Sequence, residues 1–241
     1  MNEVDMKVSH GQFVSIVGES GCGKSTLAGI LMGKNKGYSG TVTVGGKELK
    51  SITEESLLEN ITYIGHQSYL FKGTVRDNLL LGIPAAKRRC ISENARACDE
   101  TLWQVLEKVN LAEFFKGEKG LDTQLNEKAG NLSGGQCQKL ALARALLHES
   151  EIYVLDEATS NIDVESENDI MREVYHMAKT KTVIMISHRL ANVVPPDWIY
   201  VMNQGQIVEQ GTHEKIVNQE GMYAHLWNTQ QNLENFGKET V

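Results

Sequence analysis

The sequence has few cysteines and prolines and contains no long apolar run. Its four cysteines form no C-x-x-C pair and have no histidine at zinc-finger spacing, so we expect no structural metal site. No stretch approaches the roughly 20 apolar residues of a membrane-spanning helix, and MNEVDMKVSH lacks the apolar core of a signal peptide. We therefore expect a reducing, cytoplasmic setting, in which a partner supplies any membrane role.

A basic excess is also absent, because the net charge is -7. Domains that bind DNA or RNA usually carry an excess of positive charge, so we expect no nucleic acid as the main ligand. A chain of 241 residues is long enough for one α/β domain with an appended subdomain, and it can bury a core without disulfides or metal.

Short β-branched runs recur along the chain, and each ends in a turn or a polar residue. They are FVSIVG, TVTVGG, NITYIG, EIYVLDE, KTVIMISH and WIYVM. These runs alternate with helical stretches, which is the pattern of a mostly parallel sheet covered by helices. We therefore predict an α/β fold, whose ligands bind at the carboxyl ends of the strands.

Between residues 74 and 148 the pattern becomes helical. The stretch TLWQVLEKVNLAEFF places Leu102, Val105, Leu106 and Val109 at the i, i+3, i+4, i+7 spacing of one helix face. We predict a single domain over 1–241, in which 1–73 and 149–222 form the α/β core and 74–148 form an inserted helical subdomain. The remaining residues, 223–241, form a polar tail that we expect to be helical and weakly packed.

Residues 18–25 match the pattern G-x-x-x-x-G-K-[ST], between strand-like FVSIV and helix-like STLAGILMG. The glycines let backbone N–H groups face inward, and the following helix adds roughly half a positive charge. We predict that Lys24 reaches the β- and γ-phosphates of a nucleotide and that the Ser25 hydroxyl ligates Mg²⁺. The predicted ATP-binding residues are Gly18, Glu19, Ser20, Gly21, Cys22, Gly23, Lys24, Ser25 and Thr26.

Two alternatives to this interpretation concern the same loop. A glycine-rich turn between a strand and a helix can bind nothing, but both the Lys and the Ser of the pattern are in place here. Cys22 is either a reactive thiol or, as we favour, a small residue that the loop tolerates.

Two acids end the apolar stretch EIYVLDEATSNID and are expected at the carboxyl edge of the sheet. A P-loop enzyme needs a carboxylate that positions the metal and a group that polarises the attacking water. Asp156 suits the first task and Glu157 suits the second, as a general base. The alternative is that these acids only cap a following helix.

A second glycine-containing loop, LSGGQ at residues 132–136, precedes an Ala/Leu-rich helix. Ser133 and Gln136 could form only a capping box at the start of that helix. Two adjacent glycines exceed what a cap needs and indicate close approach of the backbone to a ligand. With this loop the chain closely resembles the ATP-binding cassette, the nucleotide-binding domain of ABC transporters, whose signature sequence it matches.

The resemblance covers nearly the whole chain and implies a P-loop NTPase (RecA-like) core. That core has a mostly parallel sheet, a small antiparallel β part and an inserted helical subdomain. Gln67 looks like the Q-loop glutamine of the family and His188, in ISHRL, like its switch histidine. The D-loop is matched by Ser160, Asn161, Ile162 and Asp163.

In the family, two cassettes dimerise head to tail, and ATP on one P-loop is covered by the signature loop of the other cassette. The resemblance thus implies a second ABC cassette as partner and Ser133, Gly134, Gly135 and Gln136 as nucleotide-binding residues in trans. It implies ATP and Mg²⁺ as cofactors, with Ser25, Gln67 and Asp156 around the metal. The implied catalytic residues are Glu157, His188, Gln67 and Lys24.

Three stretches resemble the exporter branch of the family: FKGTVRDNLLLG, GLDTQLNEKAGNLSGGQ and GQIVEQGTHEKIV. This likeness implies a transmembrane domain as partner, on the same longer polypeptide, and a location at the cytoplasmic face of the membrane. The family places an adenine-stacking aromatic further upstream than the 17 residues before Gly18. We therefore expect an excised portion of a transporter that binds nucleotide more weakly than the longer chain does, because aromatic stacking on a base strengthens binding.

Other departures from the family are local. The x-loop normally has glycines where Asn126 and Ala129 stand, and Pro195 and Pro196 occupy a usually polar stretch. The alternative functions are a non-transport cassette ATPase and a regulatory cassette that binds ATP but hydrolyses it poorly. A P-loop kinase is disfavoured, because it would leave LSGGQ without a task. The transported substrate is chosen by membrane helices and cannot be read from this chain.

Overall fold

The computed structural model describes the chain except residues 2, 67–68, 85–94, 161, 194–195 and 240–241. The chain forms two compact units, which are described separately below. The first unit comprises Met1–Leu57, Ile152–Glu157 and Ala178–Val241, and the second comprises Leu58–Glu151 and Ala158–Met177.

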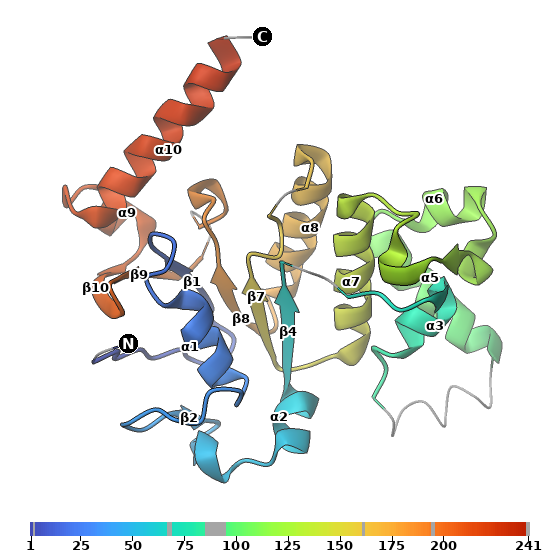
Figure 1. The fold of residues 1–241 in the computed structure, drawn as a ribbon, viewed down its shortest axis with the longest axis horizontal. Coiled ribbons are helices and arrows are strands. Elements are labelled where there is room, and N and C mark those ends of the chain that lie inside the picture. Colours follow the sequence, from blue (N-terminus) through green and yellow to red (C-terminus); the bar gives the residue numbers. More distant parts are fainter. Residues whose placement is uncertain (2, 67–68, 85–94, 161, 194–195, 240–241) are drawn as a thin grey trace. The chain divides into compact units, whose positions relative to one another are not determined.

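The first unit is built on a mostly parallel sheet (Figure 1), which confirms the predicted α/β fold. Its strands are β1 (Phe13–Val17), β7 (Ile152–Asp156), β8 (Thr182–Ile186), β9 (Trp198–Asn203) and β10 (Gln206–Gly211), in the order β10-β9-β1-β8-β7. β1 pairs in parallel with β8 and β9, and β7 pairs in parallel with β8. β10 runs antiparallel to β9, so the sheet is mixed.

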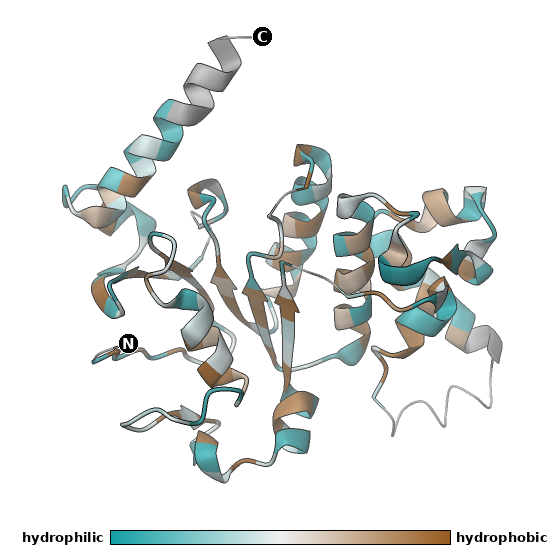
Figure 2. Cartoon of the chain, viewed as in Figure 1, coloured by the Kyte–Doolittle hydropathy of each residue, from teal (hydrophilic) through white to brown (hydrophobic). Residues whose placement is uncertain are grey.

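The central strands are buried on both faces. All five residues of β1 and all five of β8 are buried, and Figure 2 shows β1, β7 and β8 as predominantly hydrophobic segments. Parallel strands covered on both sides read as continuous apolar runs rather than as alternating ones. The runs FVSIV and TVIMI have this character and therefore settle in the middle of the sheet.

The strand register brings three distant parts of the chain to one sheet edge. Ile186 of β8 is the partner of Ile16 in β1 and also of Asp156 in β7. The Ser187 amide then donates to the Ile16 carbonyl at 3.4 Å. The residues that follow these strands therefore begin at the same level of the sheet.

The rest of the first unit consists of short elements and two C-terminal helices. They are α1 (Lys24–Leu31), the hairpin β2 (Thr43–Val44) and β3 (Lys47–Glu48), η1 (Leu49–Ser51), η4 (Leu190–Val193), α9 (His213–Val217) and α10 (Met222–Glu239), while α2 (Glu54–Asn60) crosses the boundary between the units. The Glu209 carboxylate accepts hydrogen bonds from the first two amides of α10, those of Met222 and Tyr223. The fully buried Tyr223 ring anchors this end of the helix.

The second unit is largely helical. It contains β4 (Ile61–Gly65), β5 (Gly73–Thr74), α3 (Val75–Leu80), α5 (Ala95–Lys108), α6 (Ala112–Gly117), η2 (Gly120–Asp122), β6 (Gln124–Leu125), η3 (Glu127–Ala129), α7 (Gly134–His148) and α8 (Val164–Met177). The four residues predicted to share a helix face, Leu102, Val105, Leu106 and Val109, are all buried. Asn110, with a φ of 54°, turns the backbone into the left-handed region and separates α5 from α6.

A buried ion pair joins α7 to α8 inside this unit. Lys139 Nζ donates to Asp169 Oδ2 at 2.6 Å, and both side chains are less than a tenth exposed. Asn110 Nδ2 also donates to Asp169, at 3.1 Å. Burial alone would raise the pKa of Asp169, but the hydrogen bonds from Lys139 and Asn110 outweigh it, so the pKa lies below its usual value.

We predict that Lys139→Met lowers the free energy of unfolding by about 3 kcal/mol, because it leaves the Asp169 carboxylate buried without its main partner. Urea unfolding at neutral pH measures this difference, and Lys72→Met, at an exposed position of the same unit, serves as the control. Since the pKa of folded Asp169 is depressed, the stabilisation is present above its unfolded pKa of about 3.9 and is lost as the pH falls through the folded value. A loss equal to that of Lys72→Met would contradict the prediction.

Candidate functional site

The loop between β1 and α1 exposes the amino end of α1 to a ligand. Gly23, the residue before the helix, has a φ of 112° and, as a glycine, provides no side chain to cap the helix amides. Gly18, with a φ of 148°, also lacks room for a side chain, because a Cβ atom there would overlap the Met202 carbonyl oxygen. The free amides and the positive end of the helix dipole form a site suited to phosphate.

Lys24 holds this loop from inside. Its side chain is buried, and Nζ donates to the carbonyl oxygens of Gly18 at 2.9 Å and Glu19 at 2.8 Å. Cys22 Sγ lies 3.7 Å from the same nitrogen and is buried too. These hydrogen bonds hold the loop around the ammonium group, near the amino end of α1.

The ends of α1 and β7 bring a hydroxyl next to a carboxylate. Ser25 Oγ lies 3.5 Å from Asp156 Oδ1, and Asp156 is buried while Ser25 is exposed. In the described part of the chain, no three His, Cys, Asp or Glu side chains gather into a cage for a metal ion. A single hydroxyl and a single carboxylate instead suit Mg²⁺, which keeps several waters and takes other ligands from substrate phosphates.

The next residue, Glu157, is paired with His188. His188 Nε2 lies 2.6 Å from Glu157 Oε1, and both side chains are partly exposed. Glu157 has a φ of 53°, a left-handed conformation that is uncommon outside glycine, and its amide donates to the Ile186 carbonyl at 3.0 Å. Residues held in such sparsely populated regions cluster at active sites, so this pair is the candidate for proton transfer.

The signature-like loop lies in the second unit and forms the capping box that was the alternative interpretation. Ser133 Oγ accepts from the Gln136 amide at 3.2 Å, and the Ser133 amide donates to Gln136 Oε1 at 2.8 Å. Gly135 is buried, and a Cβ atom there would overlap Ser166 Oγ and lie 2.9 Å from Asp163 Oδ2. Within this chain Gly135 packs closely against Ser166 of α8, and the predicted approach of the glycines to a ligand stays a prediction. Ser133 itself remains exposed.

Asp163, the predicted D-loop acid, stands at the start of α8. Its Oδ1 accepts from the Ser166 amide at 2.8 Å, and hydrogen bonds from Ser166 lower the pKa of Asp163. Asp163 and Ser166 therefore form one packed corner with Gly135 of the signature-like loop.

The remaining predicted site residues are either exposed or outside the described part of the chain. Glu19, Ser20, Gly21 and Thr26 are exposed on the phosphate loop and the first turn of α1. Gln67, Asn161 and Pro195 lie outside the described residues, and their predicted roles stay predictions. Ala129, where the family has a glycine, has a φ of 53°, so the backbone takes the conformation that glycine adopts without strain.

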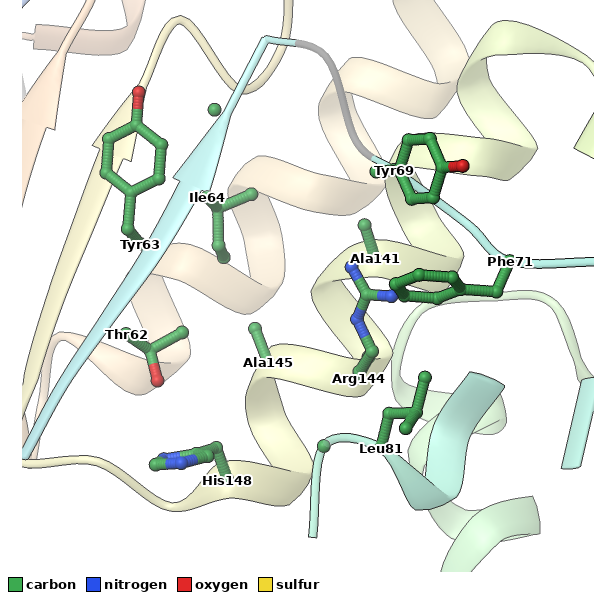
Figure 3. Close-up of a pocket in the computed structure, with 12 residues that line it drawn as sticks. Thr62, Tyr63, Ile64, Tyr69, Phe71, Leu81, Ala141, Arg144, Ala145 and His148 are labelled. Atoms are coloured by element: carbon green, nitrogen blue, oxygen red, sulfur yellow. The ribbon is translucent and has the colours of Figure 1, made fainter. Parts of the chain in front are cut away.

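A groove of about 480 Å³ lies within the second unit (Figure 3). One wall is residues 62–65 of β4, and the other is the face of α7 that carries Ala141, Arg144, Ala145 and His148. Tyr69, Phe71 and Leu81 line it as well, and each of these three is roughly half exposed. The rings of Tyr69 and Phe71 pack edge to face, with 4.9 Å between their centroids.

Comparison with known proteins places the chain. A family model described as ABC transporter matches residues 1–160, which is more than half of the chain. The chain belongs to the ABC transporter family. The predicted recognition of an ABC nucleotide-binding domain is thereby confirmed. Among the described residues, no helix combines the length and the hydrophobicity that a membrane span requires.

Individual relatives support the exporter-like branch. The chain is 44% identical over 96% of its length to an uncharacterized ABC transporter ATP-binding protein of Haemophilus influenzae, and covers 39% of it. It is 36% identical over 99% of its length to multidrug resistance protein 1 of Entamoeba histolytica, and covers 18% of that protein. A solved structure of a bacterial Atm1-family ABC exporter with ATP bound matches 94% of the chain, with a TM-score of 0.84 and 32% identity.

The chain spans about two fifths or less of the length of these relatives, and it covers 38% of the solved exporter chain. The motifs in the sequence predict the loop at residues 18–25 and the strand-end acids, and the structure places both at the ends of strands. Sequence reasoning missed the groove, whose lining comes from segments about 60 residues apart and follows no motif. The one feature of the sequence that could have indicated it is the pair of aromatic residues in SYLF, which the structure shows to be exposed.

We predict that Gly135→Ala lowers the free energy of unfolding by about 1–3 kcal/mol, because the added methyl group must displace Ser166 on α8. Chemical denaturation of the purified chain measures the effect. Gly130→Ala is the matched control, since its Cβ would lie 3.6 Å from the Glu127 carbonyl, an ordinary contact distance. Equal free energies of unfolding for the two variants would contradict the prediction, because they would show that Ser166 can move without loss of stability.

Proposed function

We propose that this chain binds Mg-ATP and hydrolyses it as the ATPase domain of an exporter-type ABC transporter. The observation that carries the proposal is the convergence of the uncapped phosphate loop, Asp156 and the Glu157–His188 pair at one sheet edge of the first unit. A glycine-rich turn alone would not need two acids and a histidine at the same level of the sheet. The alternative of a nonfunctional strand-to-helix turn is therefore disfavoured.

In this proposal the loop amides and Lys24 bind the β- and γ-phosphates. The ammonium group already lies within the loop, donating to two carbonyl oxygens, and phosphate oxygens are stronger, charged acceptors for the same protons. Glu157 takes a proton from the attacking water as its oxygen bonds to the γ-phosphorus, and the bond to the ADP oxygen breaks. His188, 2.6 Å from Glu157, orients the carboxylate and contacts the γ-phosphate.

Ser25 and Asp156 would hold Mg²⁺, together with Gln67 as implied by the family resemblance. When bound, the ion supplies positive charge that stabilises the phosphate oxygens during transfer. The two residues would fix the position of the ion beside the phosphates. The Ser25 hydroxyl comes from α1, the helix proposed to bind phosphate, and Asp156 is the last residue of β7.

We further propose that a second cassette completes the site through its signature loop. Ser133 is exposed, and its side chain accepts a hydrogen bond from the Gln136 amide. The amino end of α7 offers further donors to a γ-phosphate. Residues Ser133, Gly134, Gly135 and Gln136 would act in trans, with Asp163 beside them. ATP then favours the closed dimer, and loss of the γ-phosphate lets it open.

The groove of the second unit is the proposed docking site for a membrane-spanning domain at the cytoplasmic face of a membrane. Exposed apolar patches of this kind mark interaction sites, and Tyr69, Phe71 and Leu81 form one beside a cavity of about 480 Å³. A short helix end can insert its apolar side chains there. The transmembrane domain is proposed to belong to the same longer polypeptide, as the coverage of the relatives indicates.

We predict that Glu157→Gln lowers the rate of ATP hydrolysis about 100-fold or more while ATP binding persists, because only the general base is lost. Lys24→Ala should abolish both binding and hydrolysis, since it removes the buried ammonium group that shapes the loop. Phosphate release and the fluorescence of a labelled ATP analogue measure the two properties.

The matched controls are Glu48→Gln and Lys47→Ala on the exposed strand β3, which should leave both properties unchanged. A chain that binds ATP but shows no Lys24-dependent hydrolysis would instead be the regulatory cassette of the alternative. Hydrolysis that survives Glu157→Gln would remove Glu157 from the role of base.

We predict that Glu157→Gln with Mg-ATP shifts the chain from monomer to dimer, since slow hydrolysis traps the closed state. Light scattering measures the mass. Adding Ser133→Arg should prevent the dimer by filling the signature loop with a bulky cation, whereas Ser39→Arg, at an exposed position of the first unit, should not. A dimer that tolerates Ser133→Arg would contradict binding in trans.

A further inference from the structure

Arg144 is a cation within the otherwise largely apolar groove. It lies on α7 between Ala141 and Ala145 along the face that lines the groove, and Figure 3 shows its side chain pointing into that space. No Asp or Glu is among the groove-lining residues that the structure describes. His148, at the far end of the same helix face, has its Nδ1 2.8 Å from Ser150 Oγ.

The Arg144 guanidinium has no hydrogen-bond acceptor and no carboxylate partner in the described part of the chain. It is half-buried, and this burial lowers its pKa. Two other described arginines of the same unit do have carboxylate partners. Arg76 has Asp99 as partner, which raises the pKa of Arg76, and Arg172, with 70% of its side chain exposed, pairs with Asp169 at 3.2 Å.

Covering the groove changes the environment of this cation. A guanidinium group stays charged at every pH at which the protein folds, and it carries five N–H donors in a planar fork. A partner that filled the groove with apolar side chains alone would remove water from those donors and give nothing back. A carboxylate accepts two parallel hydrogen bonds from the guanidinium group. These charge-assisted bonds offset the free energy that the group loses when water is removed from it.

We propose that Arg144 selects the docking partner by its charge: the segment that enters the groove is an amphipathic helix end that presents an Asp or Glu carboxylate beside apolar side chains. The apolar side chains pack against Phe71 and the alanines of α7, and the carboxylate pairs with Arg144. This inference rests on the docking role proposed above for the groove. It adds that a partner with a neutral or basic group at this point binds more weakly.

The test uses two small probes of the same shape, phenylbutyrate and phenylbutanamide, which differ only in carboxylate against carboxamide. The chain carries isotope-labelled alanine methyl groups, and the methyl resonances of Ala141 and Ala145 report binding in the groove. We expect the carboxylate to bind about 10-fold more tightly than the amide, because a charged acceptor meets the guanidinium. Added salt should weaken the carboxylate and leave the amide unchanged.

Variants assign the preference to one side chain. Arg144→Gln should remove the preference for the carboxylate and leave the amide affinity as it was, and Arg144→Lys should keep part of it. Arg172→Gln, which removes an exposed arginine of the same unit, should have no effect. The salt series on the unmutated chain carries the test if Arg144→Gln does not fold.

Equal affinities of the two probes, no shift of the alanine methyl groups with either probe, or a preference that persists in Arg144→Gln would each overturn the inference. Groove binding of the amide without a carboxylate preference would remove the role of Arg144 and leave the groove as a docking site. ATP hydrolysis is measured without either probe, so its outcome judges the proposed enzyme activity separately.

Discussion

The parallel pairing of β1, β8 and β7 is the constraint on which the candidate site depends. Ile186 faces Ile16 on one side and Asp156 on the other, so segments about 140 residues apart in sequence end at one level of the sheet. The strands are largely apolar, and β1 and β8 are buried along their whole length, which favours this register over a shifted one. Hydrophobic packing of the strands thus brings the loop before α1, the two acids and His188 to one edge, where Glu157 and His188 pair.

Lys24 illustrates how the loop is prepared before a ligand arrives. A buried ammonium group is costly unless acceptors surround it, and here the acceptors are carbonyls of the loop that the lysine itself closes. The same cation is thus a structural centre in the free chain and a candidate phosphate ligand in the proposed ATP complex.

The sequence predicts the position of a site residue best where that residue directly follows an apolar strand. The phosphate loop, Asp156 and Glu157 follow apolar runs directly, so their place at a strand end was predictable from the runs alone. The Glu157–His188 pairing and the Lys139–Asp169 pair depend on which strands and helices are neighbours, and a local pattern does not contain that information. No local pattern distinguishes Arg144 either, because the opposite wall of its groove comes from a distant segment of the chain.

The LSGGQ loop forms the capping box without excluding the proposed contact with a ligand. The capping box exists, and it fixes the start of α7, while Ser133 and Gly134 remain at the surface. The two glycines differ in their surroundings: Gly134 is exposed, whereas Gly135 lacks a side chain where Ser166 of α8 lies close.

The contact of Gly135 with Ser166 and Asp163 has a genetic consequence. The signature-like loop and the D-loop corner of one chain share a single packed joint, so a substitution on either side is transmitted to the other. Substitutions that suppress a defect in LSGGQ are therefore expected on α8 of the same polypeptide. In a heterodimer, such suppression would be inherited with one gene and would not be supplied by its partner.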